Sequence, residues 1–149
     1  MEMIRIIHIV PEDALWQKTI VFAEGCSWSA GKHLGQLMRA CSFSGWEAVF
    51  IAAENDDILG FCTFLKEDHY PENRYSPWIS SIFVDEAARG KRISHQLIEA
   101  AVLHAKESGF SKVYIPSDMK GFYEKCGFLP IDALTNYAGG LDTVFMREV

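Results

Sequence analysis

Three cations and a glycine stand in a row at Arg89, Gly90, Lys91 and Arg92. They precede the most regular amphipathic stretch of the chain, where a long helix is expected. A helix start presents backbone N–H groups without intrahelical acceptors, and it carries the positive end of the helix dipole. Cations placed there oppose the dipole, and a bound anion would remove that conflict. The run therefore predicts an anion site, most naturally for phosphates, with a solvated turn as the alternative. The loop matches neither the G-x-x-x-x-G-K-[ST] nor the G-x-G-x-x-G fingerprint, which disfavours an ATPase or a dinucleotide enzyme.

A second candidate for chemistry is Tyr123, in the run YIPSDMKGFYEKCGF over residues 114–128. A phenol with a pKa of about 10 can give a proton through a short hydrogen bond. A bulky aromatic residue on a short helix is also an ordinary core residue, and Phe122 and Phe128 are interpreted as core. From the residues alone, Tyr123 is either a proton donor or a part of the core.

The elements that must position these residues follow from hydrophobic periodicity and turn residues. In the long helix, Ile93, Leu97, Ile98, Ala101, Val102 and Ala105 form one apolar stripe. The run NDD between two apolar segments indicates a hairpin. We predict strands over 4–10, 46–55, 58–68, 78–86, 111–116, 127–134 and 142–148, and helices over 11–25, 30–41, 91–109 and 117–126. This order implies an α/β (α+β) fold with a mixed sheet of about seven strands, helices on both faces, and a parallel crossover from 78 to 116.

Composition bounds the function. A chain of 149 residues, 49% hydrophobic and 23% charged, is expected to form a single domain over 1–149. Its net charge of −6 argues against nucleic-acid binding. Residues 1–75 hold six Lys or Arg against eleven Asp or Glu, so this half favours a cationic ligand if it faces one; ordinary surface scatter is the alternative.

Cysteines, histidines and apolar runs suggest where the protein works. The four cysteines and five histidines match no metal-binding spacing, so no metal site is predicted. Free thiols suit a reducing cytosol, and we expect a cytoplasmic protein. No apolar run reaches the roughly 20 residues needed to span a bilayer, so no membrane association is expected.

Two motifs in this order resemble the GCN5-related N-acetyltransferase (GNAT) superfamily. The run IFVDEAARGKRISHQLIEAA (82–101) contains a counterpart of the family signature R/Q-x-x-G-x-G/A, and YEKCGF (123–128) matches the signature Y-E-x-x-G-F. The resemblance covers the element order from about residue 3 to the end. Arg92 and Ser94 stand where the family has Gly and Gly or Ala. Pro116 stands where many members have an Asn that contacts the cofactor, so Ser117 or Asp118 would supply a polar contact instead.

The resemblance implies an acetyl-CoA-dependent N-acetyltransferase that acts on a primary amine of a small molecule or a protein. It implies a sheet splayed between strands 78–86 and 111–116, with the pantetheine arm along the backbone of Ile82, Phe83 and Val84. An N–H near Ile82 or Phe83 would polarise the thioester carbonyl, and Tyr123 would protonate the CoA sulfur. The pyrophosphate would rest on the amides of Arg89, Gly90, Lys91, Arg92, Ile93 and Ser94.

The acceptor site is expected between the first two helices, the 69–77 loop and the late hairpin. These segments hold many aromatic residues, of which Trp16, like Trp46, is interpreted as core. The base that takes the amine proton stays unassigned. A non-catalytic acyl-CoA-binding or regulatory module is the alternative function, and a homodimer is one option for the oligomeric state. The candidate acceptor aromatics are Trp28, Tyr70, Tyr75, Trp78 and Tyr137, and the candidate bases are Glu47, Glu54, Asp68 and His69.

Overall fold

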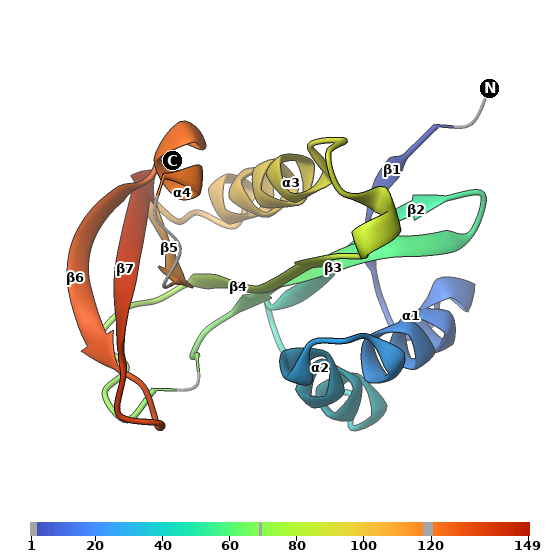
Figure 1. Cartoon of the computed structure of the whole chain (residues 1–149), viewed down its shortest axis with the longest axis horizontal. Helices are drawn as coiled ribbons and strands as arrows, with labels where there is room; N and C mark the ends of the chain where they lie inside the picture. The colour runs from blue at the N-terminus through green and yellow to red at the C-terminus, as the bar shows by residue number, and fades with distance from the viewer. Residues whose placement is uncertain (1–2, 69, 118–120) are drawn as a thin grey trace.

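The computed structural model describes residues 3–68, 70–117 and 121–149. Within them, one seven-stranded sheet has the order β1-β2-β3-β4-β5-β7-β6 (Figure 1). All neighbouring strands are antiparallel except β4 and β5, which are parallel. The strands are β1 (Arg5–Ile9), β2 (Ala48–Glu54), β3 (Asp57–Leu65), β4 (Trp78–Val84), β5 (Lys112–Ser117), β6 (Leu129–Thr135) and β7 (Leu141–Glu148).

Helices cover both faces of the sheet, as the sequence predicts. Helices α1 and α2 lie on one face, and α3 and α4 lie on the other (Figure 1). Each face has its own buried apolar cluster, and β2 is buried along nearly its whole length because it lies between them. No helix in the described part of the chain is long and apolar enough to cross a membrane. The helices are α1 (Ala14–Gly25), α2 (Ser29–Arg39), α3 (Ile93–Glu107) and α4 (Phe122–Lys125), with a 3₁₀ turn over Glu86–Ala88.

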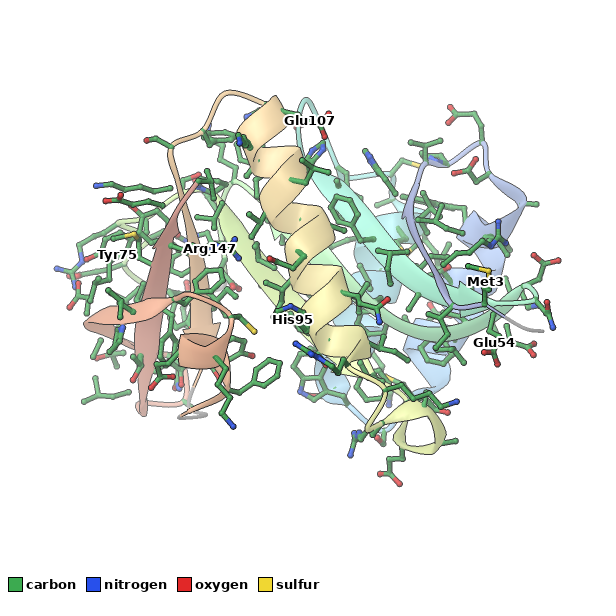
Figure 2. All side chains as sticks on the ribbon, turned by 90° about the horizontal axis from the view of Figure 1, so that it is seen from above. Met3, Glu54, Tyr75, His95, Glu107 and Arg147 are labelled. Carbon is green, nitrogen blue, oxygen red and sulfur yellow. The ribbon has the colours of Figure 1, made fainter. Side chains whose placement is uncertain are left out.

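Helix α3 crosses the sheet and its buried residues are those of the predicted stripe (Figure 2). Burying each large aliphatic side chain contributes roughly 1.5–3 kcal/mol relative to leaving it exposed. The six stripe residues therefore fix the rotation of α3 about its axis, and with it the direction in which the helix start points. Those residues are Ile93, Leu97, Ile98, Ala101, Val102 and Ala105.

The hairpin predicted from NDD is confirmed. Strands β2 and β3 are joined by Asn55 and Asp56, both with positive φ (52° and 70°). Two successive left-handed residues match the right-handed twist of the flanking strands, and Asn and Asp tolerate this conformation better than most residues.

The sheet divides between β4 and β5. Their ladder contains a single residue pair, Trp78 with Tyr114, and the strands diverge beyond it. Strand β4 is also irregular on its other side. Thr63 pairs with Ser80 and Phe61 with Phe83, so one extra residue is inserted in β4, and Ser81 has φ of 52°. The predicted splay is therefore present, and a β-bulge lies at its edge.

Two predicted helix boundaries were wrong. Helix α1 begins at Ala14 rather than at Pro11, because the Asp13 carboxylate accepts the Val10 N–H (2.8 Å) and holds a turn there. Of the helix predicted over 117–126, residues 118–120 lie outside the described residues, and the rest is helical only over Phe122–Lys125. Ser117 still pairs with β7, and Gly121 has φ of 93°, which a helix interior does not allow.

The two glycines of α2 explain how a sequence with weak helix propensity packs closely on α1. A Cβ at Gly31 would lie 2.4 Å from the Ala23 carbonyl oxygen and 2.4 Å from Cys26 Sγ. A Cβ at Gly35 would lie 2.5 Å from Cγ of Glu24, a flexible side chain whose carboxylate pairs with Arg39. At Gly31 the backbone of α2 therefore lies too close to the α1 backbone to admit a Cβ.

We expect Gly31→Ala to lower the free energy of unfolding by about 1–3 kcal/mol, because the helices must separate to admit the methyl group. This loss exceeds the gain of roughly 1 kcal/mol in helix propensity. Gly35→Ala is the matched control, since Glu24 can rotate away, and its loss should be smaller. Urea unfolding of both variants measures the difference. Equal stabilities for Gly31→Ala and the wild type would show that α1 and α2 can separate with little loss of unfolding free energy.

Candidate active site

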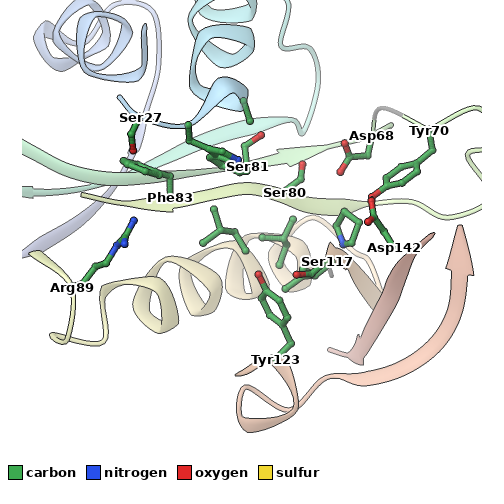
Figure 3. A pocket seen from close by; sticks show the side chains of 16 residues that line it. Ser27, Asp68, Tyr70, Ser80, Ser81, Phe83, Arg89, Ser117, Tyr123 and Asp142 are labelled. Atoms are coloured by element: carbon green, nitrogen blue, oxygen red, sulfur yellow. The ribbon is translucent and has the colours of Figure 1, made fainter. Parts of the chain in front are cut away.

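A pocket of about 610 Å³ opens where β4 and β5 diverge. Figure 3 shows that it is elongated: Arg89 and Phe83 lie toward one end, and Asp68, Tyr70 and Asp142 lie toward the other. A cation thus stands at one end and two carboxylates at the opposite end. The middle of the pocket is lined by residues that include Ser80, Ser117 and Tyr123.

The cationic end leads into the turn that starts α3. Gly90 has φ of 88°, and Arg92, the N-cap residue, has φ of 60°. The Arg92 side chain makes no capping hydrogen bond, and the first intrahelical bond runs from Gln96 N to Arg92 O (3.1 Å). The amides of residues 93–95 therefore have no intrahelical acceptor and are directed out of the helix start. This arrangement fits an anion such as a phosphate.

Arg92 occupies a conformation that glycine normally takes. The left-handed region costs a residue with a Cβ about 1–2 kcal/mol. Arg92 thus stands in the left-handed conformation that a glycine, the family's usual residue at this position, adopts at the least cost.

Arg89 is held in place by the strand that precedes it. Its Nε donates a hydrogen bond to the Val84 carbonyl oxygen (3.1 Å), and the side chain lines the pocket. The bond fixes the guanidinium at the pocket's end before any ligand arrives. The Val84 carbonyl oxygen has two lone pairs, so it can accept this bond and still pair with an extended ligand as predicted.

The β4 bulge places backbone groups beside the pocket. Ser81 and Ile82 fall between the registered pairs of β3 and β4, and both line the pocket. A bulge leaves an extra residue outside the regular ladder, so its backbone polar groups need other partners. The positions expected to polarise a carbonyl, Ile82 and Phe83, thus lie at this irregularity.

Tyr123 is 7% exposed and lines the pocket. Its ring packs on Phe122 and Phe145, with centroid distances of 5.1 and 5.3 Å. The phenol rises from α4 into the pocket (Figure 3). The residue is therefore part of the core through its ring and part of the pocket through its hydroxyl end.

The other residues of the Y-E-x-x-G-F run build the short helix that carries this tyrosine. The Glu124 carboxylate accepts the Gly121 N–H (3.0 Å) at the helix start. Gly127, with φ of 86°, ends the helix, and Phe128 is fully buried and donates its N–H to the Tyr123 carbonyl (3.1 Å). The spacing of the motif thus reflects three requirements: Glu124 caps the helix start, Gly127 ends the helix in a left-handed conformation, and Phe128 packs in the core.

Contacts with β7 and α3 also hold helix α4 in position. Arg147 on β7 donates to the Cys126 carbonyl (3.1 Å) and to the Glu99 carboxylate of α3 (2.7 Å). The Cys126 thiol lies 3.4 Å from His95 Nδ1 on α3, and burial raises the pKa of that thiol. Figure 2 shows His95 and Arg147 on the side of the sheet that α3 covers. These contacts fix the position of α4, and hence of Tyr123, relative to α3.

The acidic end is an organised structure rather than a loose surface. The Tyr70 hydroxyl donates to Asp142 Oδ2 (2.7 Å), and Asn136 Nδ2 donates to Asp142 Oδ1 (3.3 Å). Tyr70 lies in the loop between β3 and β4, whereas Asp142 is the second residue of β7. This pair joins the two halves of the sheet across the pocket.

The structure gathers part of the predicted cofactor site into the pocket lining. Ile82, Phe83, Arg89, Ser117 and Tyr123 line it. The remaining predicted positions lie outside the lining. Val84 is turned into the core, and Ile93, 2% exposed, can offer only its backbone amide to a ligand at the turn. The other residues of the turn are Gly90, Lys91, Arg92 and Ser94.

Of the predicted acceptor aromatics, Trp28 and Tyr70 line the pocket. Trp78 is fully buried and cannot contact an acceptor, whereas Tyr75 and Tyr137 lie outside the lining of this pocket. Trp16 and Trp46 pack in the core, as the sequence suggests.

Among the candidate bases, Asp68 lines the pocket and Glu54 does not. Glu47 lies in neighbouring pockets and accepts the backbone N–H groups of Ser44 and Lys66. His69 and Asp118 lie outside the described residues. Sequence reasoning missed Ser27, Ser80, Ser81 and Asp142, because no local motif marks them.

Comparison with known proteins places this geometry in a family. The family model described as an acetyltransferase (GNAT) domain matches residues 45–130, more than half of the chain. A stretch of 53 residues is 38% identical to glucosamine 6-phosphate N-acetyltransferase 1 from Oryza sativa subsp. japonica. That match covers 34% of this chain and 32% of the rice protein, so the chain spans only about a third of this curated relative.

Solved structures share the fold over nearly the whole chain. A GNAT family acetyltransferase from Elizabethkingia anophelis, crystallised with acetyl-CoA bound, has a TM-score of 0.68 at 17% identity and covers 98% of both chains. Aminoglycoside 6'-acetyltransferase type Ii has a TM-score of 0.75 at 15% identity, over 97% of this chain and 96% of its own. With the family match over residues 45–130 and a splayed sheet of the same fold, this protein belongs to the GNAT acetyltransferase family.

Proposed function

We propose that the whole chain, residues 1–149, forms one catalytic domain that transfers an acetyl group from acetyl-CoA to a primary amine. One observation carries the proposal: an elongated pocket joins a cationic end at Arg89 to an acidic end at Asp68 and Asp142, with Tyr123 between them. An acyl donor rich in phosphate and an amine acceptor need opposite charges at the two ends of one site. Family membership supports acetyltransferase activity and acetyl-CoA as the donor.

The residues at the donor end fit CoA. The amides at the start of α3, with Arg89 and Lys91 beside them, would hold the phosphates through charge-assisted hydrogen bonds. The unpaired edge of β4 near Ile82 and Phe83 would receive the extended arm as an added strand. Acetyl-CoA supplies the acyl thioester, and the backbone N–H at the bulge would polarise its carbonyl oxygen.

Tyr123 would act as the general acid. When the amine nitrogen bonds to the acetyl carbon, the carbon–sulfur bond breaks and the sulfur needs a proton. The Tyr123 hydroxyl would give that proton, and the amine would lose its own proton to a base or to water. The core packing of the ring holds the hydroxyl in one direction, which a proton donor requires.

The names of related proteins include acceptors of opposite charge. The rice relative is named for glucosamine 6-phosphate, an anionic amine, and aminoglycoside acetyltransferases are named for cationic ones. Two carboxylates at the acceptor end disfavour a phosphorylated acceptor and favour a cationic one.

The assay is thiol release from acetyl-CoA over a panel of small amines and a lysine peptide. Turnover with any amine supports the enzyme. Binding is measured separately, as the shift in melting temperature with CoA alone. A shift in melting temperature without turnover on any amine would instead support the non-catalytic acyl-CoA-binding module. The absence of a shift would contradict both the enzyme and the binding module.

A cytoplasmic location is part of the proposal. All four cysteines are free thiols, and burial keeps the pKa of Cys62 far above its usual range. Reduced thiols of this kind suit the cytosol.

A further inference from the structure

Trp28 forms a wall of the pocket and has no role in the transfer proposed above. It is the N-cap residue of α2, it lines the pocket, and it is 38% exposed. Its ring stacks on Phe83 with a centroid distance of 6.1 Å and an interplanar angle of 17°. Phe83 stacks in turn on the fully buried Phe61 (5.5 Å, 28°). The three rings therefore make a layered aromatic wall whose outermost ring is Trp28.

The short connection between α1 and α2 holds Trp28 in this position. The Trp28 carbonyl oxygen accepts the Gly31 N–H (3.0 Å), and it lies 3.4 Å from the Cys26 thiol. Gly31 is itself packed so closely on α1 that no Cβ fits there. Because the backbone is fixed and the ring is stacked on Phe83, displacing the indole would break favourable aromatic contacts.

The proposed transfer leaves one side of the pocket for the substituent of the acyl group. The backbone at the β4 bulge is assigned to the carbonyl oxygen, Tyr123 is assigned to the sulfur, and the amine approaches from the acidic end. An acyl carbon is trigonal, so its third substituent points away from both the oxygen and the sulfur. Tyr123 packs in the core cluster under α3, whereas Phe83 packs in the cluster under α1 and α2. Figure 3 shows Ser27 and Phe83 across β4 from Tyr123, so the acyl substituent is expected on the side that carries Trp28.

We propose that Trp28 selects a short acyl group on the donor, because its ring occupies the space that the further methylene groups of a longer chain would need. This inference rests on the proposed function and adds a donor-selecting residue to it. The reaction is the same for every acyl group. The nitrogen–carbon bond forms, the carbon–sulfur bond breaks, the sulfur takes a proton from Tyr123, and the amine releases one to a base or to water.

The test compares acetyl-, propionyl- and butyryl-CoA as donors to one amine, in the wild type and in Trp28→Phe, Trp28→Leu and Trp28→Ala. In the wild type, kcat/KM should fall by about tenfold or more from acetyl- to butyryl-CoA, because the longer chain overfills the space beside the indole. In Trp28→Ala this difference should disappear or reverse, since each methylene group buried in the vacated apolar space favours binding by about fourfold. The other two variants should fall between these limits.

Binding without turnover gives a second readout. Calorimetry in the absence of an amine measures the Kd values of acetyl- and butyryl-CoA, and their ratio should shift toward butyryl-CoA by about tenfold or more in Trp28→Ala. Leu103→Ala is the control, because Leu103 is an apolar residue of α3 that is 57% exposed and does not line the pocket. It should leave both ratios unchanged.

Several results would overturn the inference. Equal use of acetyl- and butyryl-CoA by the wild type would show that the wall does not limit the acyl chain. An unchanged donor ratio in all three Trp28 variants would make Trp28 only a cover for Phe83, while the acetyltransferase itself stands. A higher KM for the amine with the same donor ratio would assign Trp28 to the acceptor instead. If no donor supported turnover, the catalytic proposal would fall, and the Kd ratio would still decide whether Trp28 selects the acyl chain.

Discussion

Replacing Tyr123 with phenylalanine should lower kcat for acetyl transfer by about a hundredfold, the usual contribution of a general acid. The ring packs on Phe122 and Phe145, and phenylalanine keeps those contacts, so the fold and the pocket should persist. If Tyr123 is the general acid, the variant loses only the group that protonates the departing sulfur. Initial rates of thiol release give kcat, and calorimetry gives the Kd for CoA, which should change far less than kcat.

Tyr75→Phe is the control for this variant. It also removes one phenol hydroxyl, but that hydroxyl bonds to Asp132 and the residue does not line the pocket. Its kcat should match the wild type. Full turnover in Tyr123→Phe would reduce Tyr123 to a packing residue, which is the alternative that the sequence left open.

Replacing Arg89 with alanine should raise the Kd for CoA by about ten- to a hundredfold. A hydrogen bond between charged groups contributes roughly 1.5–3 kcal/mol, and the Val84 carbonyl already fixes this guanidinium at the pocket's end. The salt dependence of the Kd should also become weaker, since one cation facing the phosphates is removed. Calorimetry at two salt concentrations measures both effects.

Arg74→Ala serves as the comparison, because Arg74 pairs with Glu72 and Asp132 away from the pocket lining. It removes the same charge from the protein without removing a pocket residue. If the two variants bind CoA equally well, the phosphates lie elsewhere, and the turn before α3 is only a solvated connection.

The sequence predicted elements well where a local pattern also determined burial. The apolar stripe predicted on α3 is correct because the residues of that one helix face are buried together. The turn predicted at Asn55 and Asp56 is correct because it depends only on the positive φ angles of these two adjacent residues. Ser117, expected to begin the helix over 117–126, instead lies in β5 because it pairs with β7. That pairing joins segments far apart in the sequence, and no local propensity carries it.

The same limit applies to the site. Arg89 and Tyr123, which both line the pocket, could be singled out in the sequence because each belongs to a contiguous motif. Asp142 could not be, because its meeting with Tyr70 depends on how β7 lies against the loop after β3. The bulge at Ser81 could not be predicted either, because no sequence pattern indicates that a non-glycine residue will take a positive φ.

The single ladder pair between β4 and β5 has a mechanical consequence. Most of the interactions that hold the two halves of the sheet together must come from side chains on its two faces, since the backbone ladder between β4 and β5 has one residue pair. A coenzyme arm that lies along β4 would add contacts across the divergence between β4 and β5. The protein should therefore be stiffer while it holds its donor than after the donor leaves.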